Sequence, residues 1–248
     1  MRQLIAILFV GILVCLASAA HAQTFSVDHF HKVIISPYIQ ATFVQGDEES
    51  VTINSTIVDS NKLRIEVQHG TLRVYLDGAK DIPNYQRDYE SDGNPHNYPI
   101  YPNHAMLVTI TYRKLDDLSL RGTEKYLCLS PLSVNTFSLH VYGEATVIFT
   151  EVHIGRMHTH LYGESSLDVR SGEVNRQYYT CFGDGKINTT AIAGRAAKVT
   201  AFGEAEFKVN VSDRIKVTAF GEAKLRYMGN PTIVKGIHLG NVDVQKLN

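Results

Sequence analysis

One short phrase recurs five times between residues 142 and 223, and it decides the fold. Its copies are Tyr142-Gly143-Glu144-Ala145, Tyr162-Gly163-Glu164-Ser165, Phe182-Gly183-Asp184-Gly185, Phe202-Gly203-Glu204-Ala205 and Phe220-Gly221-Glu222-Ala223. The glycines are 20, 20, 20 and 18 residues apart. A repeat of this length, filled with short strand-like runs, is typical of a chain that winds into stacked β-coils. Gly122, 21 residues before Gly143, closes a degenerate first copy.

Aligning the copies on the glycine gives columns of uniform chemistry. Apolar side chains stand two residues before and four residues after it: Leu120, Val141, Leu161, Cys181, Ala201 and Ala219, and then Val147, Leu167, Ile187, Phe207 and Leu225. Polar residues such as His140, His160 and Thr180 alternate with them. Period-two alternation that returns in every coil indicates strands with one buried face. Stacking the coils in register then places like side chains about 4.8 Å apart.

Successive antiparallel hairpins are the alternative architecture for such a repeat. Hairpins would need a tight turn such as Asn-Gly about every ten residues, and none recurs. A parallel coil keeps the same residue at the same corner in every turn, as the glycine column does. Parallel crossovers are right-handed. The sequence therefore predicts an all-β chain that forms a right-handed parallel β-helix, or β-solenoid, with coils of ~20 residues.

The glycine column predicts a corner that requires positive φ or close approach between coils. Approach of the backbone to a ligand is the alternative interpretation. The aromatic residues just before the glycines should form a stack, comprising Tyr142, Tyr162, Phe182, Phe202 and Phe220. This stack is either a packing ladder or, if it faces solvent, a surface for stacking sugar rings.

The acidic residues after the glycines, Glu144, Glu164, Asp184, Glu204 and Glu222, should also lie one above another. Two unit charges about 5 Å apart repel by roughly 1 kcal/mol in water and ~3 kcal/mol at an effective dielectric constant of 20. The row is tolerated only if it splays into solvent, pairs with cations such as Lys186 and Lys224, or binds a metal. A solvated face is the simpler interpretation and calcium the sharper one. Stacked charges also discourage sideways aggregation of a β surface.

Residues 23–112 also predict β structure, continuous with the β-helix repeats at 113–248. His69-Gly70, between two alternating runs, predicts a hairpin or tight corner. Residues 77–104 break the rhythm with a loop insertion containing Pro83, Pro95, Pro99, Pro102, Tyr85, Tyr89, Tyr98 and Tyr101. So long an excursion in a compact domain is often functional. It is either a solvated insertion packed by its own tyrosines or a tyrosine-rich loop that contacts a partner.

The first 22 residues predict a signal peptide. Arg2 supplies its positive charge, residues 4–16 its apolar stretch, and Ala20-His21-Ala22 a small-residue cleavage site. Cys15 suggests a lipoprotein, but Val14 before it does not suit that processing, so we expect cleavage after Ala22. No later stretch is long enough to span a membrane. The mature protein is therefore expected in the periplasm, on the outer surface or secreted.

Composition narrows the classes of function. The formal net charge is -1, and about -2 once Arg2 is removed, which argues against nucleic-acid binding and against a polybasic membrane binder. Only Cys128 and Cys181 remain in the mature chain. They belong to different columns three coils apart, roughly 14 Å along the axis at ~4.8 Å per coil, beyond the ~7 Å Cα limit for a disulfide. We expect two free, inward-facing cysteines.

Together these motifs resemble the auto-transporter adhesin head family called the GIN domain, which is common in exported proteins of Bacteroidetes type. The matching stretches are 30–33, 39–46, Val51-Thr52-Ile53, Gly70-Thr71-Leu72, 115–122, the Gly-Glu repeats and Tyr227-Met228-Gly229-Asn230-Pro231. The resemblance covers nearly the whole mature chain and implies a parallel β-helix with no catalytic residues to transfer. This chain has aromatic-Gly-Glu where family members usually carry Ser-Gly-Ser-Gly, and the insertion at 77–104 is a second departure.

The leading functional hypothesis is a non-catalytic exported cell-surface or periplasmic protein, an adhesin-like or structural binding module. Its candidate binding residues are the aromatic and acidic columns, and its partner is an extracellular glycan or a surface protein. The alternative is a polysaccharide lyase or hydrolase, since β-helices often host these enzymes. Such chemistry needs converging groups, whereas the acids form a uniform row and His153, His158 and His160 lack a recurrent metal spacing. No catalytic residue, metal site or cofactor is predicted.

Overall fold

The computed structural model describes residues 23–83, 85–89 and 95–247, and nearly all of their regular structure is β-strand. The predicted signal peptide, with Cys15 and the cleavage site after Ala22, lies outside the described residues. The amino-terminal strands are β1 (Gln23–Ser26), β2 (Lys32–Ile35), β3 (Ile39–Gln45), β4 (Ser50–Thr56), β5 (Leu63–Gln68), β6 (Thr71–Leu76), β7 (Tyr85–Tyr89), β8 (Pro95–Pro99) and β9 (Met106–Tyr112). A 3-10 turn, η1 (Ser60–Lys62), precedes β5.

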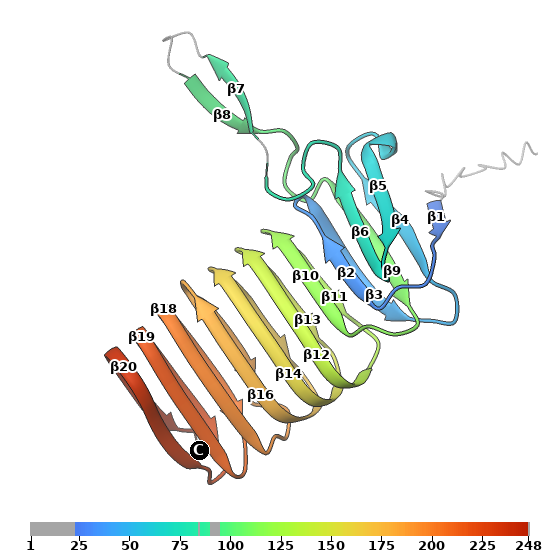
Figure 1. The fold of residues 1–248 in the computed structure, drawn as a ribbon. Helices are drawn as coiled ribbons and strands as arrows, with labels where there is room; N and C mark the ends of the chain where they lie inside the picture. The colour runs from blue at the N-terminus through green and yellow to red at the C-terminus, as the bar shows by residue number, and fades with distance from the viewer. Residues whose placement is uncertain (1–22, 84, 90–94, 248) are drawn as a thin grey trace, which may run out of the picture.

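The repeats form a parallel β-solenoid of about six turns (Figure 1). Its strands are β10 (Asp117–Gly122), β11 (Lys125–Cys128), β12 (Leu132–Gly143), β13 (Thr146–Phe149), β14 (Val152–Gly163), β15 (Ser166–Val169), β16 (Gly172–Phe182), β17 (Gly185–Thr189), β18 (Ala196–Asn210), β19 (Arg214–Met228) and β20 (Thr232–Lys246). Successive coils pair in register, so that Gly143 lies beside Gly163 and Phe202 beside Phe220. The predicted parallel β-helix is confirmed.

The interior of the solenoid is filled by the predicted apolar columns. Leu161, Cys181 and Ala201 follow one another in neighbouring coils and are fully buried. Cys128 belongs to another column, beside Phe149, and is also buried. Both cysteines are free, as predicted. Burial raises the pKa of the Cys181 thiol to about 12, so this thiol remains protonated and unreactive at neutral pH.

The amino-terminal strands continue the solenoid rather than forming a separate body. β10 and β11 stack on β2 and β3, while β6 and β9 stack on the opposite side of β2 and β3, all in parallel. β5 then pairs antiparallel with β6, β4 with β9, and β1 with β4. The hairpin predicted at His69-Gly70 connects β5 to β6. These antiparallel strands close the first end of the stack.

The opposite end of the solenoid is formed by β20, which pairs with β19 (Figure 1). Lys235 and His238 occupy the positions that continue the buried columns of Val217 and Ala219. Both are exposed, so polar side chains take the place of core residues in the last coil. Gly240, with a φ of 128°, continues the glycine column one coil beyond the copies recognised in the sequence.

Candidate functional site

The glycine corners combine a positive φ with close approach between neighbouring coils, and each of these features favours glycine. The φ angles are 114° at Gly143, 98° at Gly163, 105° at Gly183, 115° at Gly203 and 135° at Gly221. A Cβ atom on Gly163 would lie 2.4 Å from the carbonyl oxygen of Gly143 in the preceding coil. The left-handed backbone and the close approach of coils therefore both exclude a side chain. The residues on either side of each corner project outward.

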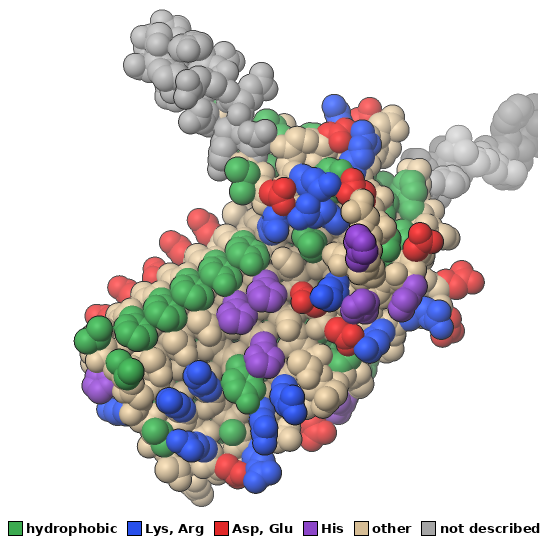
Figure 2. Space-filling model, in the orientation of Figure 1, with side chains coloured by type: hydrophobic (Ala, Val, Ile, Leu, Met, Phe, Trp, Pro, Cys, Tyr) green, Lys and Arg blue, Asp and Glu red, His purple; other side chains and the backbone are tan. Residues whose placement is uncertain are grey.

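The residues before the corners form a continuous aromatic ladder of Tyr142, Tyr162, Phe182, Phe202 and Phe220. Successive ring centroids are 4.7, 4.8, 4.8 and 5.0 Å apart, and neighbouring rings lie within 4° of parallel. Four of the five side chains are 36–39% exposed, and Tyr162 is partly buried. Figure 2 shows the ladder as a row of hydrophobic side chains along one edge of the molecule. The ladder thus faces solvent.

Stacking limits which part of each ring a partner can reach. Every inner ring has a neighbouring ring on both faces, so its edge is the part that meets solvent. At one end, the Arg121 guanidinium lies 5.8 Å from the centre of the Tyr142 ring. At the other end, Leu239 follows Phe220 in register. The aromatic ladder is therefore a ridge of ring edges, with its two terminal faces beside Arg121 and Leu239.

The acidic ladder, formed by Glu144, Glu164, Asp184, Glu204 and Glu222, follows the corners on their other side. All five side chains are exposed. Glu164, Asp184, Glu204 and Glu222 line a shallow groove together with Lys186, Glu206 and Lys224. Within the described part of the chain, Lys186 and Lys224 form no ion pair, and no three His, Cys, Asp or Glu side chains converge as metal ligands would. The carboxylates splay into solvent.

One acid lies inside the corner rather than outside it. Glu124 occupies the same column as Ala145 and Ser165 and is almost fully buried. Its carboxylate accepts hydrogen bonds from the backbone N–H groups of Tyr38 at 3.0 Å and Thr123 at 2.8 Å. Burial raises the pKa of Glu124, and these backbone hydrogen bonds act against the rise. Glu124, between β10 and β11, thereby connects its own coil to the coil of β2 and β3, in which Tyr38 has a positive φ.

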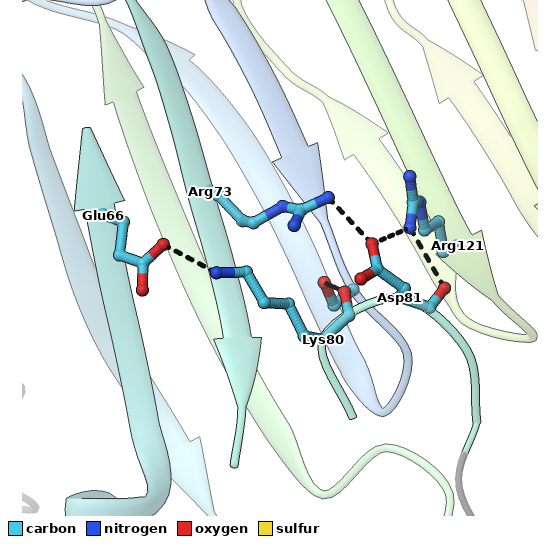
Figure 3. A network of polar contacts seen from close by, with 6 residues as sticks. Glu66, Arg73, Lys80, Asp81 and Arg121 are labelled. Carbon is cyan, nitrogen blue, oxygen red and sulfur yellow. Dashed lines mark hydrogen bonds and ion pairs between the residues drawn. The ribbon is translucent and has the colours of Figure 1, made fainter. Parts of the chain in front are cut away.

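A polar network connects the start of the predicted insertion to the aromatic ladder (Figure 3). Asp81 accepts hydrogen bonds from Arg73 at 3.0 Å and from Arg121 at 2.6 Å, and Lys80 pairs with Glu66 at 3.0 Å. The hydrogen bond from Arg121 is the main cause that lowers the pKa of Asp81. Arg121 stands one coil before Tyr142 in the same column. Asp81 therefore holds the cation that ends the ladder.

The insertion itself is only partly described. β7 and β8 form a separate antiparallel hairpin between residues 77 and 104. The Tyr101 hydroxyl donates to the Asp77 carbonyl at 2.7 Å, and its ring meets Tyr38 edge-on at 5.7 Å. Tyr98 is 46% exposed. The side chains of Tyr85 and Tyr89 lie outside the described residues, and Tyr101 packs onto the solenoid.

A row of partly buried histidines and threonines runs beside the aromatic ladder on the same sheet. His140 and His160 stack with ring centres 5.1 Å apart, and Thr180, Thr200 and Thr218 follow them. Burial lowers the pKa of His160, and the neighbouring His140 and His158 lower it further. Burial and then Arg156 lower the pKa of His158. The imidazoles of His158 and His160 are therefore neutral at pH 7.

A basic groove that the sequence did not predict lies farther along the same strands. Its lining includes Arg176, Tyr178, Lys198, Arg214 and Lys216. Figure 2 shows Lys and Arg side chains gathered on the face that also carries the aromatic ladder. Tyr178, Lys198 and Lys216 share one column, five residues before the glycines, and Arg176 and Arg214 share another, seven residues before them. Extending the column alignment to those positions would have exposed the groove.

Comparison with protein families matches residues 29–231 to the family described as the putative auto-transporter adhesin, head GIN domain. The chain belongs to this family. The match begins just before β2 and ends just before β20, so it contains every corner with an aromatic-Gly-acid phrase. The resemblance expected from the sequence is confirmed. A search of curated protein sequences returned no match.

Solved structures share the GIN-domain fold at low sequence identity. A putative adhesin from Bacteroides fragilis is 16% identical, with a TM-score of 0.71 over 91% of this chain and 96% of that one. A putative adhesin from Parabacteroides merdae is 16% identical, with a TM-score of 0.60 over 92% and 95% of the two chains. A putative lipid binding protein from Parabacteroides distasonis is 17% identical, with a TM-score of 0.63 over 92% and 96%. At these identities the likeness shows the fold.

The described residues contain no helix with the length and apolar character needed to cross a membrane.

Proposed function

We propose that this GIN-domain protein is an exported, non-catalytic binding module of the cell envelope or cell surface. The observation that carries the proposal is that the aromatic ladder and the acidic ladder are both exposed, one on each side of the same glycine corners. The two ladders together are called the ridge below. Regular spacing on a rigid solenoid presents the same two groups in successive coils. Such a surface suits an extended partner that makes the same contact several times.

The ridge favours a partner that carries little negative charge. The five carboxylates of the acidic ladder repel anions, while the aromatic edges offer apolar contact. A neutral extracellular glycan, or a strand of a surface protein with apolar and basic side chains, would satisfy both rows. Contact along the ridge uses ring edges and the adjacent backbone rather than one ring face.

Support for a binding role also comes from the family and from two structural neighbours described as putative adhesins. An enzyme of the β-helix class would need acids, bases or a metal that converge on one bond. The acids of the described chain that stand out in the sequence are spread along the solenoid axis, one per coil. We therefore assign no catalytic step to these residues.

The proposal is tested by screening the mature chain, residues 23–248, against neutral glycans and envelope proteins. We expect binding that is lost in the double variant Phe182→Thr/Phe202→Thr, which interrupts the middle of the ladder. Thr180→Ala/Thr200→Ala, in the row beside the ladder, is the matched control and should bind normally. Unchanged binding by the ladder variant would remove the ridge as the contact surface, and depolymerisation of any glycan would refute the non-catalytic assignment.

A further inference from the structure

The charges of the basic groove lack protein partners. The lining cations Arg176, Lys198, Arg214 and Lys216 are all exposed, as is Arg156, which lies beside Arg176 in the preceding coil. None of these five takes part in the ion pairs found among the described residues. Asp213, the acid that precedes Arg214 in the sequence, pairs with Arg195 at 2.6 Å instead. Five cations thus remain free to meet an anionic ligand.

These cations are arranged along the solenoid axis rather than along one strand. Arg156 and Arg176 are neighbours in adjacent coils, and Arg214 lies two coils beyond Arg176, with Ala196 between them. Lys198 and Lys216 are neighbours in the column next to it. Coils are ~4.8 Å apart, and the two columns are separated by two residues, or roughly 7 Å. An extended ligand that crosses the strands would meet a cation in each of several successive coils.

Tyr178, which lines the basic groove, has a neighbouring ring on one face only, as the two end rings of the aromatic ladder have. Its ring stacks on His158 with centres 4.6 Å apart. The next residue in its column is Lys198, so no further ring covers the second face among the described side chains. Tyr178 and Lys198 together line both the basic groove and the adjoining hollow beside His160 and Thr200. An apolar ring face next to an unpaired ammonium group fits a sugar ring that carries an acid.

We propose that the basic groove binds an acidic linear polysaccharide whose sugar units carry carboxylate or sulfate groups. The polysaccharide chain runs along the solenoid axis, with one sugar ring against Tyr178 where this residue and Lys198 line the groove. Acid groups on neighbouring sugars pair with Lys198 and Lys216 on one side and with Arg176 and Arg214 on the other. Guanidinium groups bind carboxylate and sulfate oxygens through two parallel hydrogen bonds. This site is separate from the ridge and does not depend on its function.

The surroundings favour a polysaccharide over other polyanions. Duplex nucleic acid and anionic membranes are large and need a broad cationic field. Here the cations form a compact patch on a chain of formal charge -1, and the acidic ladder lies on the far side of the same corners. A broad polyanion would meet that acidic row, whereas a narrow chain confined to the groove would not.

Titration calorimetry with the mature chain, residues 23–248, tests the proposal directly. The probes are heparin for sulfate, polygalacturonate for carboxylate and dextran as the uncharged polymer. We expect heparin or polygalacturonate to bind, dextran not to bind, and the affinity to fall as salt is raised. Lys198→Gln/Lys216→Gln should weaken binding about tenfold or more, because two charged contacts are lost. Tyr178→Ser introduces the residue type that Ser138 has in the same column two coils earlier. This variant should weaken binding of the acidic polymer about threefold or more.

Lys186→Gln/Lys224→Gln is the matched control, since it removes the same charge on the acidic side of the corners and should leave the affinity unchanged. Equal losses in the two double variants, equal binding of dextran, or no binding of either acidic polymer would overturn the proposal. Tighter binding of duplex DNA or phosphatidylglycerol vesicles would replace the polysaccharide by another occupant and would also overturn it. Phe182→Thr/Phe202→Thr should bind the acidic polymer normally, which separates this test from that of the ridge.

Discussion

The aromatic ladder and the basic groove lie on the same face of the same strands, four residues apart, and they use repetition in opposite ways. In the ladder, every coil supplies the same kind of ring, and the rings cover one another. In the groove, the residue changes from coil to coil, and unpaired cations follow the Tyr178 ring in its column. Repetition stabilises the stack, and departures from it leave groups free for other molecules.

The largest loss of stability is expected when a methyl group is added at a glycine corner. Gly163→Ala should lower the free energy of unfolding by about 3 kcal/mol or more, because the residue has positive φ and the new Cβ meets the Gly143 carbonyl oxygen at 2.4 Å. In Gly183→Ala the corresponding distance is 3.0 Å, so the loss should be about half as large. Urea unfolding of the two variants gives both values.

Ser165→Ala controls for substitutions near the corner, because alanine stands at this position in the preceding coil, as Ala145, and in two later coils, as Ala205 and Ala223. It should cost no more than about 1 kcal/mol, the value of the hydrogen bond to the Gly143 carbonyl. Equal losses at Gly163, Gly183 and Ser165 would contradict the corner geometry.

The irregular first corner provides the next largest effect. Glu124→Ala should lower the free energy of unfolding by about 2 kcal/mol, since the N–H groups of Tyr38 and Thr123 would lose their acceptor. Glu144→Ala, one coil later and exposed, should change it by no more than about 0.5 kcal/mol. Chemical denaturation compares the two variants, and a larger effect at Glu144 would show that the acidic ladder contributes to folding.

Within the ladder, an inner ring should contribute more than an end ring. Phe182→Thr removes two stacking contacts and should lower the free energy of unfolding by about 1 kcal/mol. Tyr142→Thr removes one stacking contact and the contact with Arg121, and should lower it by less. Because Phe182 and Phe202 share a contact, the double variant should lose less than the sum of the single variants. Additive losses would mean that the rings act independently. Thermal unfolding measures these differences.

The smallest expected effect concerns the histidine row between the two surfaces. The pKa values of His158 and His160 are lowered in the folded protein, so folding opposes their protonation. Their contribution to stability is present above the ordinary pKa of 6.5 and is lost as the pH falls below it. His160→Thr introduces the residue type that Thr180 and Thr200 have in the next two coils. It should reduce the slope of melting temperature against pH below pH 6.5. An unchanged slope would exclude His160 as its source.

The sequence predicts those parts of the fold that depend on chemistry repeated at each corner. Alternation beside the glycines predicts the buried columns, and their register correctly separates Cys128 from Cys181. The copy at Leu239-Gly240-Asn241 escaped notice because it lacks both the aromatic and the acid. The order of the amino-terminal strands had no local signal, since β6 and β9 stack beneath strands that precede them in the chain.

The candidate site was only half visible in the sequence. The aromatic column stands directly before a corner, where period-two alternation is interrupted, so the pattern could not decide whether it faced the core or solvent. The basic groove needs residues of three kinds from several coils, and no single stretch of sequence shows a basic cluster. A net charge near zero concealed it, because the acidic ladder offsets its cations.

The polar side chains of the final coil have a consequence for self-association. An open strand at the end of a β-solenoid is a template on which another molecule can stack, and repeated stacking would build a fibre. A second molecule seated on β20 would have to bury Lys235 and His238 at positions where the preceding coil has Val217 and Ala219. Burying an unpaired charge is costly. The exposed polar side chains of β20 therefore oppose the stacking of a second molecule on this strand.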